Sequence, residues 1–149
     1  MGWDGNSSSD GYTPFTPVWT AAGGSPAIGS GGALSMRYNV QPGNLVTVDF
    51  YMLLGTTGLN IGTGTWTFTL PVPALNSPSS NIARGNIWFR DVSASLDYPT
   101  GFVILPTAST LNIRGLSGTG TSTLLGSTAP VVPAAGDWIS GQFTYEAAA

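Results

Sequence analysis

Residues 33–54 alternate apolar and polar side chains on both sides of a Pro-Gly pair, and this is the pattern of a β-hairpin. Pro42 supplies a fixed φ and Gly43 a positive φ, as a type II turn requires. The alternation predicts two strands that share one apolar face, formed by Leu34, Met36, Tyr38, Val40, Val46, Val48, Phe50, Met52 and Leu54. Because no stretch of ten residues shows a helical period, this hairpin sets the expected fold class.

The rest of the chain shows the same short apolar runs separated by turn residues. Further strands are predicted in the opening ribbon at 12–20 and at 65–70, 84–93, 101–105, 110–114 and 138–147. Two Gly- and Thr-rich connections, 54–64 and 115–137, separate them, and the second is long enough to contain a short strand around Thr123. We expect an all-β fold, a single antiparallel β-sandwich of about eight strands with jelly-roll-like connections.

The opening ribbon, GYTPFTPVWT at residues 11–20, has the aromatic content of a strand but contains Pro14 and Pro17. Proline cannot donate to a ladder, so this ribbon is not expected at the centre of a sheet. The residues before it are Gly, Ser, Asn and Asp around Trp3. We therefore expect a flexible N-terminal arm over 1–11 and a sandwich domain over 12–149.

The composition limits the classes of partner. Charged residues make up 7% of the 149-residue chain, against about 25% in an average protein. With a net charge of -3, no lysine and four arginines, the chain lacks the basic clusters that bind nucleic acid. Its apolar runs are too short to span a membrane, and Met1–Asp4 do not have the composition of a signal peptide. No nucleic-acid or membrane partner is expected.

Catalytic and metal-binding chemistry has few candidate residues. Without His, Cys or Lys, most acid–base and nucleophilic pairings are impossible. Asp49 and Glu146 could form a glycosidase-like carboxylate pair, but we favour pairing of Asp49 with Arg37 across the hairpin. The segment 4–11 loosely matches a calcium loop, although it lacks the required Gly and closing Glu. We expect no enzyme activity, cofactor or metal.

The aromatic residues fall into two groups. Phe50, Trp66, Phe68 and Phe143 lie on apolar strand faces and are expected in the core. The second group surrounds the early prolines. It could form a lid over its own core or a contact with a partner chain, since aromatic residues dominate interface hot spots. The candidate partner interface consists of Trp3, Tyr12, Phe15, Val18 and Trp19.

Four segments in this order resemble a β-rich module of tailed-phage virion proteins, particularly of actinobacterial phages. They are YTPFTPVWT, SPAIGSGGALSMRYNVQPGNLVTVDFYM, IGTGTWTFTLPVP and GQFTYEA, which cover roughly residues 12–74 and 138–147. Met36 departs from the module, in which Gly usually precedes Arg-Tyr. The module is found at the ends of tail-fibre and minor tail proteins and in small head-decoration proteins.

The resemblance implies a virion part, and the absence of a fibre shaft before the module favours a capsid decoration protein. Such a protein would bind the major capsid protein, lie on the capsid surface of the virion and form a homotrimer. The alternative is a tail- or fibre-associated module that binds a receptor or glycan through the loops at 54–64 or 115–137.

Overall fold

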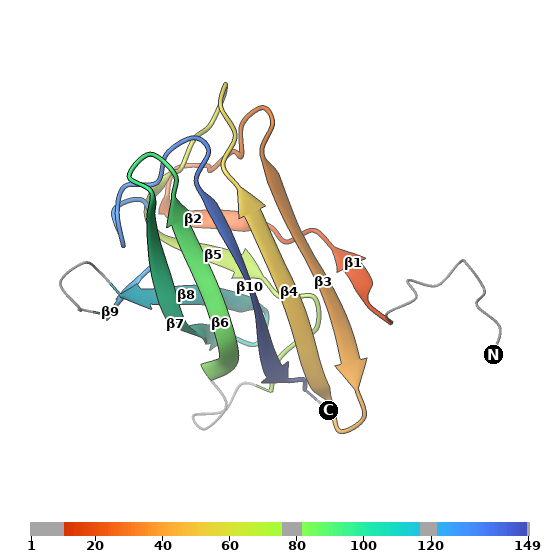
Figure 1. Cartoon of the computed structure of the whole chain (residues 1–149). Helices are drawn as coiled ribbons and strands as arrows, with labels where there is room; N and C mark the ends of the chain where they lie inside the picture. The colour runs from red at the N-terminus through yellow and green to blue at the C-terminus, as the bar shows by residue number, and fades with distance from the viewer. Residues whose placement is uncertain (1–10, 76–81, 117–121, 149) are drawn as a thin grey trace.

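The computed structural model describes residues 11–75, 82–116 and 122–148, which form ten β-strands and no helix (Figure 1). The strands are β1 (Thr13–Phe15), β2 (Trp19–Gly23), β3 (Ala33–Gln41), β4 (Leu45–Leu53), β5 (Thr63–Thr69), β6 (Ile82–Asp91), β7 (Leu96–Thr107), β8 (Thr110–Leu116), β9 (Ser122–Leu124) and β10 (Trp138–Glu146). The all-β prediction is confirmed. No helix in the described part of the chain could cross a bilayer.

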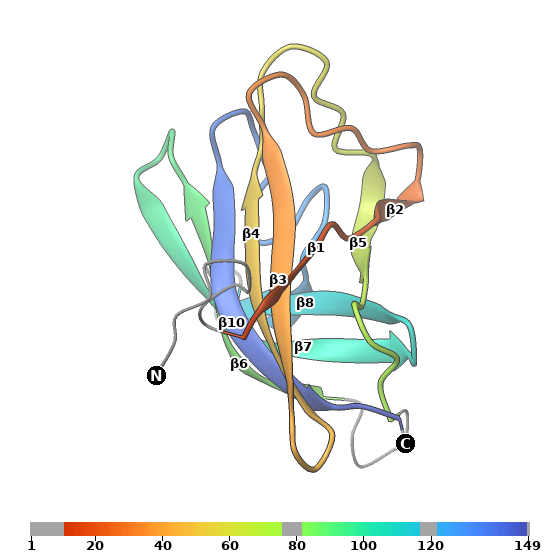
Figure 2. The same ribbon diagram turned by 90° about the vertical axis from the view of Figure 1, so that its right-hand side faces the viewer.

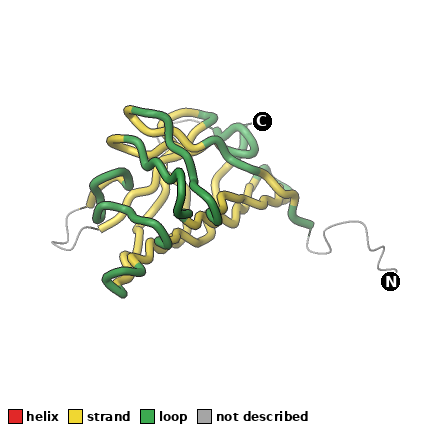
Figure 3. The backbone as a smooth tube through the Cα atoms, turned by 90° about the horizontal axis from the view of Figure 1, so that it is seen from above, coloured by secondary structure: helices red, strands yellow, loops and turns green. Residues whose placement is uncertain are grey.

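The strands pair antiparallel in the order β1-β3-β4-β10-β6-β7-β8-β5-β2, with β9 beside β8. This path folds into two layers, which are seen from above in Figure 3. Strands β3, β4, β10 and β6 form the front layer, and β8, β5 and β2 run across behind them (Figures 1 and 2). The chain crosses repeatedly between the layers, so the predicted antiparallel sandwich is confirmed.

Two strands are added to the eight expected because the opening ribbon divides into β1 and β2, and because the connection at 115–137 contains β9. Strand β9 lies within one residue of the short strand predicted around Thr123.

Strand β7 is also longer than the predicted 101–105. It begins at Leu96 and includes Pro99, which lies opposite Trp88 of β6. Pairing of β7 with β8 starts only at Thr100, so Pro99 occupies an edge position where its missing N–H does not interrupt a ladder.

The hairpin predicted over 33–54 is confirmed by the register of β3 and β4. Gln41 pairs with Leu45 around a three-residue turn, in which Gly43 has a φ of 87° and Asn44 a φ of 63°. The apolar face of β4 is completely buried, whereas Val40 at the end of β3 is half exposed. The structure therefore agrees with the alternation except near the tip of the hairpin, where Val40 is exposed and Thr47, on the opposite face of β4, is buried.

The core lies between the two layers and contains all four aromatic residues expected there. Phe50 of β4 meets Phe68 of β5 edge to face, with ring centroids 5.1 Å apart, and so joins the front layer to the back. Trp66, Phe89 and Phe143 are also completely buried. Burial of each such ring contributes on the order of 2–3 kcal/mol, and edge-to-face pairs add further stabilisation.

The opening ribbon connects the two ends of the sheet path. Strand β1 pairs with β3 at one end, and β2 pairs with β5 at the other. Residues 16–18 join these strands across the open side of the sandwich (Figure 2). The expectation that the proline-containing ribbon avoids the sheet centre is confirmed. We call residues 11–23 the strap.

Candidate functional site

The strap contains four of the five residues expected at a partner interface, and they do not share one surface. Trp19 is only 8% exposed, and its ring meets Trp66 edge to face at 4.9 Å between centroids. Phe15 packs partly buried against the same core. These two rings therefore match the alternative of a lid over the chain's own core. Trp3 lies outside the described residues.

Tyr12 and Val18 differ from the two buried rings. The guanidinium carbon of Arg37 lies 4.9 Å above the centre of the Tyr12 ring, a cation–π contact that ties the start of the strap to β3. Val18 is 60% exposed between the buried residues Pro17 and Trp19. Its backbone is fixed, because its N–H donates to the Thr69 hydroxyl at 2.8 Å and its carbonyl accepts from the Thr69 N–H at 3.1 Å. Val18 is thus an apolar side chain held in an ordered position at the surface.

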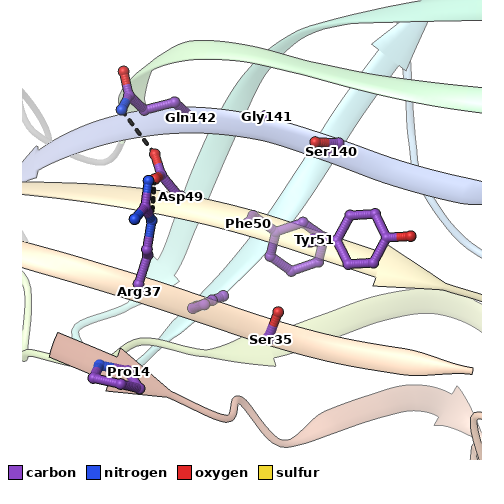
Figure 4. A pocket seen from close by; sticks show the side chains of 10 residues that line it. Pro14, Ser35, Arg37, Asp49, Phe50, Tyr51, Ser140, Gly141 and Gln142 are labelled. Carbon is purple, nitrogen blue, oxygen red and sulfur yellow. Dashed lines mark hydrogen bonds and ion pairs between the residues drawn. The ribbon is translucent and has the colours of Figure 1, made fainter. Parts of the chain in front are cut away.

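The contact of Tyr12 with Arg37 continues across the outer face of the front layer. Arg37 Nε donates to Asp49 Oδ2 at 2.6 Å, and Gln142 Nε2 donates to Asp49 Oδ1 at 2.8 Å (Figure 4). The preference for an Arg37–Asp49 pair across the hairpin is therefore confirmed. Because these side chains are partly exposed, the ion pair contributes no more than about 1 kcal/mol. Its main effect is to fix three polar groups in one row.

The carboxylate pair considered from the sequence is not assembled. Asp49 pairs with Gln142, whereas Glu146 pairs with Leu45, so the two acids lie four residues apart along neighbouring strands. That separation is about 14 Å between their Cα atoms, and both oxygens of Asp49 already accept hydrogen bonds. Glycosidase carboxylates lie about 5–9.5 Å apart. The geometry does not favour a two-carboxylate mechanism.

A shallow groove of about 630 Å³ lies on this outer face, between β1 and β10. Pro14 forms its rim at the sheet edge. Arg37, Asp49 and Gln142 line one side, and Ser35, Tyr51 and Ser140 line the other (Figure 4). The floor contains Gly141, whose position allows a close approach of β10 to β6, because a Cβ there would overlap the backbone oxygen of Asn86. The groove is open to solvent along its length.

A row of side chains extends from the groove across three strands. Tyr51 of β4 pairs with Ser140 of β10, which pairs with Trp88 of β6. Directly paired residues project from the same face of a sheet. Tyr51 is 41% exposed and Trp88 47% exposed, whereas Ile87 and Phe89 beside Trp88 are buried. Two exposed aromatic rings therefore flank a serine hydroxyl on the outer face.

The two loops expected to bind a glycan differ in how much of them is described. The loop at 54–64 lies against residues 27–30, with hydrogen bonds in both directions between Ala27 and Asn60 and between Ser30 and residues 56 and 57. The connection at 115–137 is described except for 117–121, and its most exposed apolar side chain is Val132. Neither loop has exposed aromatic residues among those described. These loops supply no stacking surface.

The described residues contain no cluster of three acidic, His or Cys side chains that could hold a metal ion. Residues 4–10 of the loose calcium-loop match lie outside the described part. A scan of protein-family models and searches of curated proteins and solved structures find no match for this chain.

Tyr51 and Trp88 were not among the candidate site residues. The alternation of the hairpin placed Tyr51 on the face opposite Phe50 and Met52, and the alternation of Ile87, Trp88 and Phe89 could have separated Trp88 from its buried neighbours in the same way. However, Ile87, Trp88 and Phe89 are all apolar, so the sequence alone does not show which of them face the core.

Proposed function

We propose that this chain is a non-enzymatic structural protein of a tailed-phage virion, which decorates and reinforces the assembled head. The sequence resemblance supports the virion assignment, and the low charge supports a protein covered by partners. The observation that carries the proposal is the strap. It ties the two sheet edges together and holds Val18 exposed between buried neighbours.

The proposed partner is the major capsid protein on the outer surface of the shell. Val18 would contribute apolar contact area without a large loss of conformational freedom, because its backbone is already fixed by Thr69. The unpaired edge of β1, which pairs only with β3 among the described strands, could add a strand from a neighbouring chain. That edge is the proposed site of self-association into a trimer.

The strap contact is tested by binding of the purified protein to heads that lack it. Val18→Glu should weaken head binding at least tenfold while the thermal unfolding temperature stays the same, because the side chain is exposed. Val132→Glu is the matched control, since Val132 is 66% exposed on a different part of the chain and should bind as the wild type does. Equal binding by both variants would contradict a contact through the strap.

The N-terminal arm is tested in the same assay by deletion of residues 1–11. The proposal predicts weaker binding to heads, because Trp3 and the start of the strap would be lost. Tyr12→Ala separates the contribution of the Tyr12–Arg37 contact from that of the arm. Unchanged binding by both variants would remove this segment from the interface.

A second candidate function, a tail- or fibre-associated glycan-binding module, is favoured by the exposed aromatic row on the front layer. The two candidates predict different copy numbers and positions, many copies on the head or few at the tail. They can be separated on intact virions.

A further inference from the structure

We infer that the outer face of the front layer is a binding site for a neutral glycan chain. The site combines the groove with the row Tyr51–Ser140–Trp88. This inference goes beyond the proposed decoration role and does not depend on it. It also places glycan binding on the sheet and not on the loops.

The aromatic rings are the first reason. Apolar faces of sugar rings stack on exposed aromatic side chains, which supply contact area at little cost in conformational entropy. Tyr51 and Trp88 are two strands apart, a separation of about 9.5 Å, which is close to the length of two linked sugar rings. Trp138, half-buried on the next row and opposite Arg90, adds apolar surface beside them. The rings are thus spaced to contact two sugars that lie two units apart in one chain.

The polar side chains are the second reason. Ligand sites fix orientation with a few placed hydrogen-bonding groups around apolar contacts. Ser140 lies between the two rings, and Ser35 lies on the other side of Tyr51. Gln142 and Asp49 form the adjacent row and are held in position by the bond between them. Hydroxyl, amide and carboxylate groups arranged beside aromatic rings match the alternating apolar faces and hydroxyl edges of a sugar.

Charge decides in favour of a neutral ligand. Five charged side chains project from the four strands of this face, and Asp97 of the neighbouring β7 pairs with one of them, so the three arginines and three carboxylates together have a formal charge of zero. They are Arg37, Arg84, Arg90, Asp49, Asp97 and Glu146. Arg37 pairs with Asp49, and Arg90 pairs with Asp97 at 2.9 Å. An RNA or single-stranded DNA also stacks on aromatic rings, but it requires a positively charged groove along its backbone. This face does not provide one.

The length of the face also suits a chain. From Pro14 at the rim of the groove to Trp88, the site crosses four strand spacings, about 19 Å. The groove is open, so a polymer can pass across the strands without an end having to enter a cavity. The site therefore fits an internal stretch of about four sugar units.

The test is native affinity electrophoresis of the full chain through gels that contain dextran, mannan, galactomannan or hydroxyethyl cellulose. We expect at least one of these neutral polysaccharides to retard the wild type. Trp88→Ala and Tyr51→Ala should each weaken that binding about tenfold or more, because each removes a stacking ring. Tyr51→Phe keeps the ring and should bind within about threefold of the wild type.

Val132→Ala is the control for an exposed apolar side chain outside the site, and thermal unfolding checks that each variant is folded. Absence of retardation by all four polysaccharides would overturn the inference, as would unchanged binding by the two alanine variants. Retardation only by acidic hyaluronan or by an oligo-dT strand would overturn the assignment of a neutral ligand. Size-exclusion chromatography tests whether a second copy covers the face. A dimer that the wild type forms and that Trp88→Ala and Tyr51→Ala both abolish would show this. Since head binding is measured separately with Val18→Glu, the two proposals can fail independently.

Discussion

The side chain of Asn112 joins two strands at the point where their ladder ends, because its Nδ2 donates a 2.7 Å hydrogen bond to the backbone oxygen of Trp66. Strands β8 and β5 pair through Leu111 and Phe68 and through Thr110 and Thr69. Beyond these pairs the N–H of Trp66 donates to Leu125 instead. The amide of Asn112 thus supplies the partner that the Trp66 carbonyl would otherwise lack in the core.

Replacement of Asn112 by alanine should lower the free energy of unfolding by about 1–3 kcal/mol, because a buried carbonyl loses its donor. The same amide also donates to the Thr67 hydroxyl at 2.9 Å, which would be lost as well. Asn86→Ala is the control, since Asn86 is exposed on β6. Urea denaturation measures both variants, and equal midpoints would show that the buried amide contributes nothing.

The Asp137 carboxylate connects the turn after β6 to the segment before β10 through hydrogen bonds. The residue is only 1% exposed, and its two carboxylate oxygens accept hydrogen bonds from the N–H of Val92 at 2.9 Å and of Ala134 at 2.8 Å. Asp137→Asn places an NH₂ group against one of these donors and should cost about 2–3 kcal/mol of unfolding free energy. Asp97→Asn removes only a partly exposed ion pair and should change it by less than about 1 kcal/mol. A smaller loss for Asp137→Asn than for Asp97→Asn in thermal unfolding would contradict this role.

Tyr145 makes the stability of the folded protein depend on pH in the alkaline range. Burial raises the pKa of its hydroxyl well above its ordinary value, and this hydroxyl donates to the Val72 carbonyl at 2.7 Å. In the unfolded chain a tyrosine ionises near pH 10. The folded protein keeps its proton at higher pH, so this group leaves stability unchanged below about pH 10 and lowers it as the pH rises further.

The measurement is the unfolding free energy between pH 8 and 11.5. Tyr145→Phe should reduce stability at pH 8 by about 1 kcal/mol, because the backbone groups of Val72 lose their partner, and should flatten the decline at high pH. Tyr51→Phe, which changes an exposed tyrosine, is the control and should keep the wild-type decline. The same slope in all three proteins would contradict the assignment to Tyr145.

Gly141 permits the close approach of β10 and β6 beneath the groove. A Cβ at this position would overlap the backbone of Asn86 and Ile87, so Gly141→Ala should destabilise the protein by about 1–3 kcal/mol. It should also weaken polysaccharide binding, because Ser140 and Gln142 would shift with the strand. Ser140→Ala leaves the backbone undisturbed and should unfold as the wild type does. Thermal unfolding of the two variants tests this prediction. An unfolding temperature of Gly141→Ala equal to that of the wild type would mean that β10 and β6 can move apart without loss of stability.

Local patterns predicted the elements whose signals are close together in sequence. The hairpin at 33–54 has alternation and a Pro-Gly turn within one stretch, so the hairpin was predicted, although its turn also includes Asn44. The β6–β7 hairpin was missed, because its turn contains no Gly or Pro. Asp91 stabilises that turn by accepting hydrogen bonds from the Ala94 N–H and the Ser93 hydroxyl, which also lower its pKa, and Ser95 adopts a φ of 54°.

The candidate site could not be predicted because it depends on distant pairings. Tyr51, Ser140 and Trp88 lie in one row only after β10, the last strand of the chain, inserts between β4 and β6. Trp19 presented a similar difficulty. The prolines before it left open whether it covers the chain's own core or a partner chain, and its contact with Trp66 places it in the core. Sequence alternation assigned faces to strands, and the order of the strands decided which faces share a surface.

The central claim, that the chain decorates the phage head, is tested most directly by immunogold labelling of intact virions with antibodies against this protein. Counting gold particles on heads and tails separates the proposals. The account predicts dense labelling over the whole head surface and none along the tail. Labelling confined to the tail or its tip would contradict it.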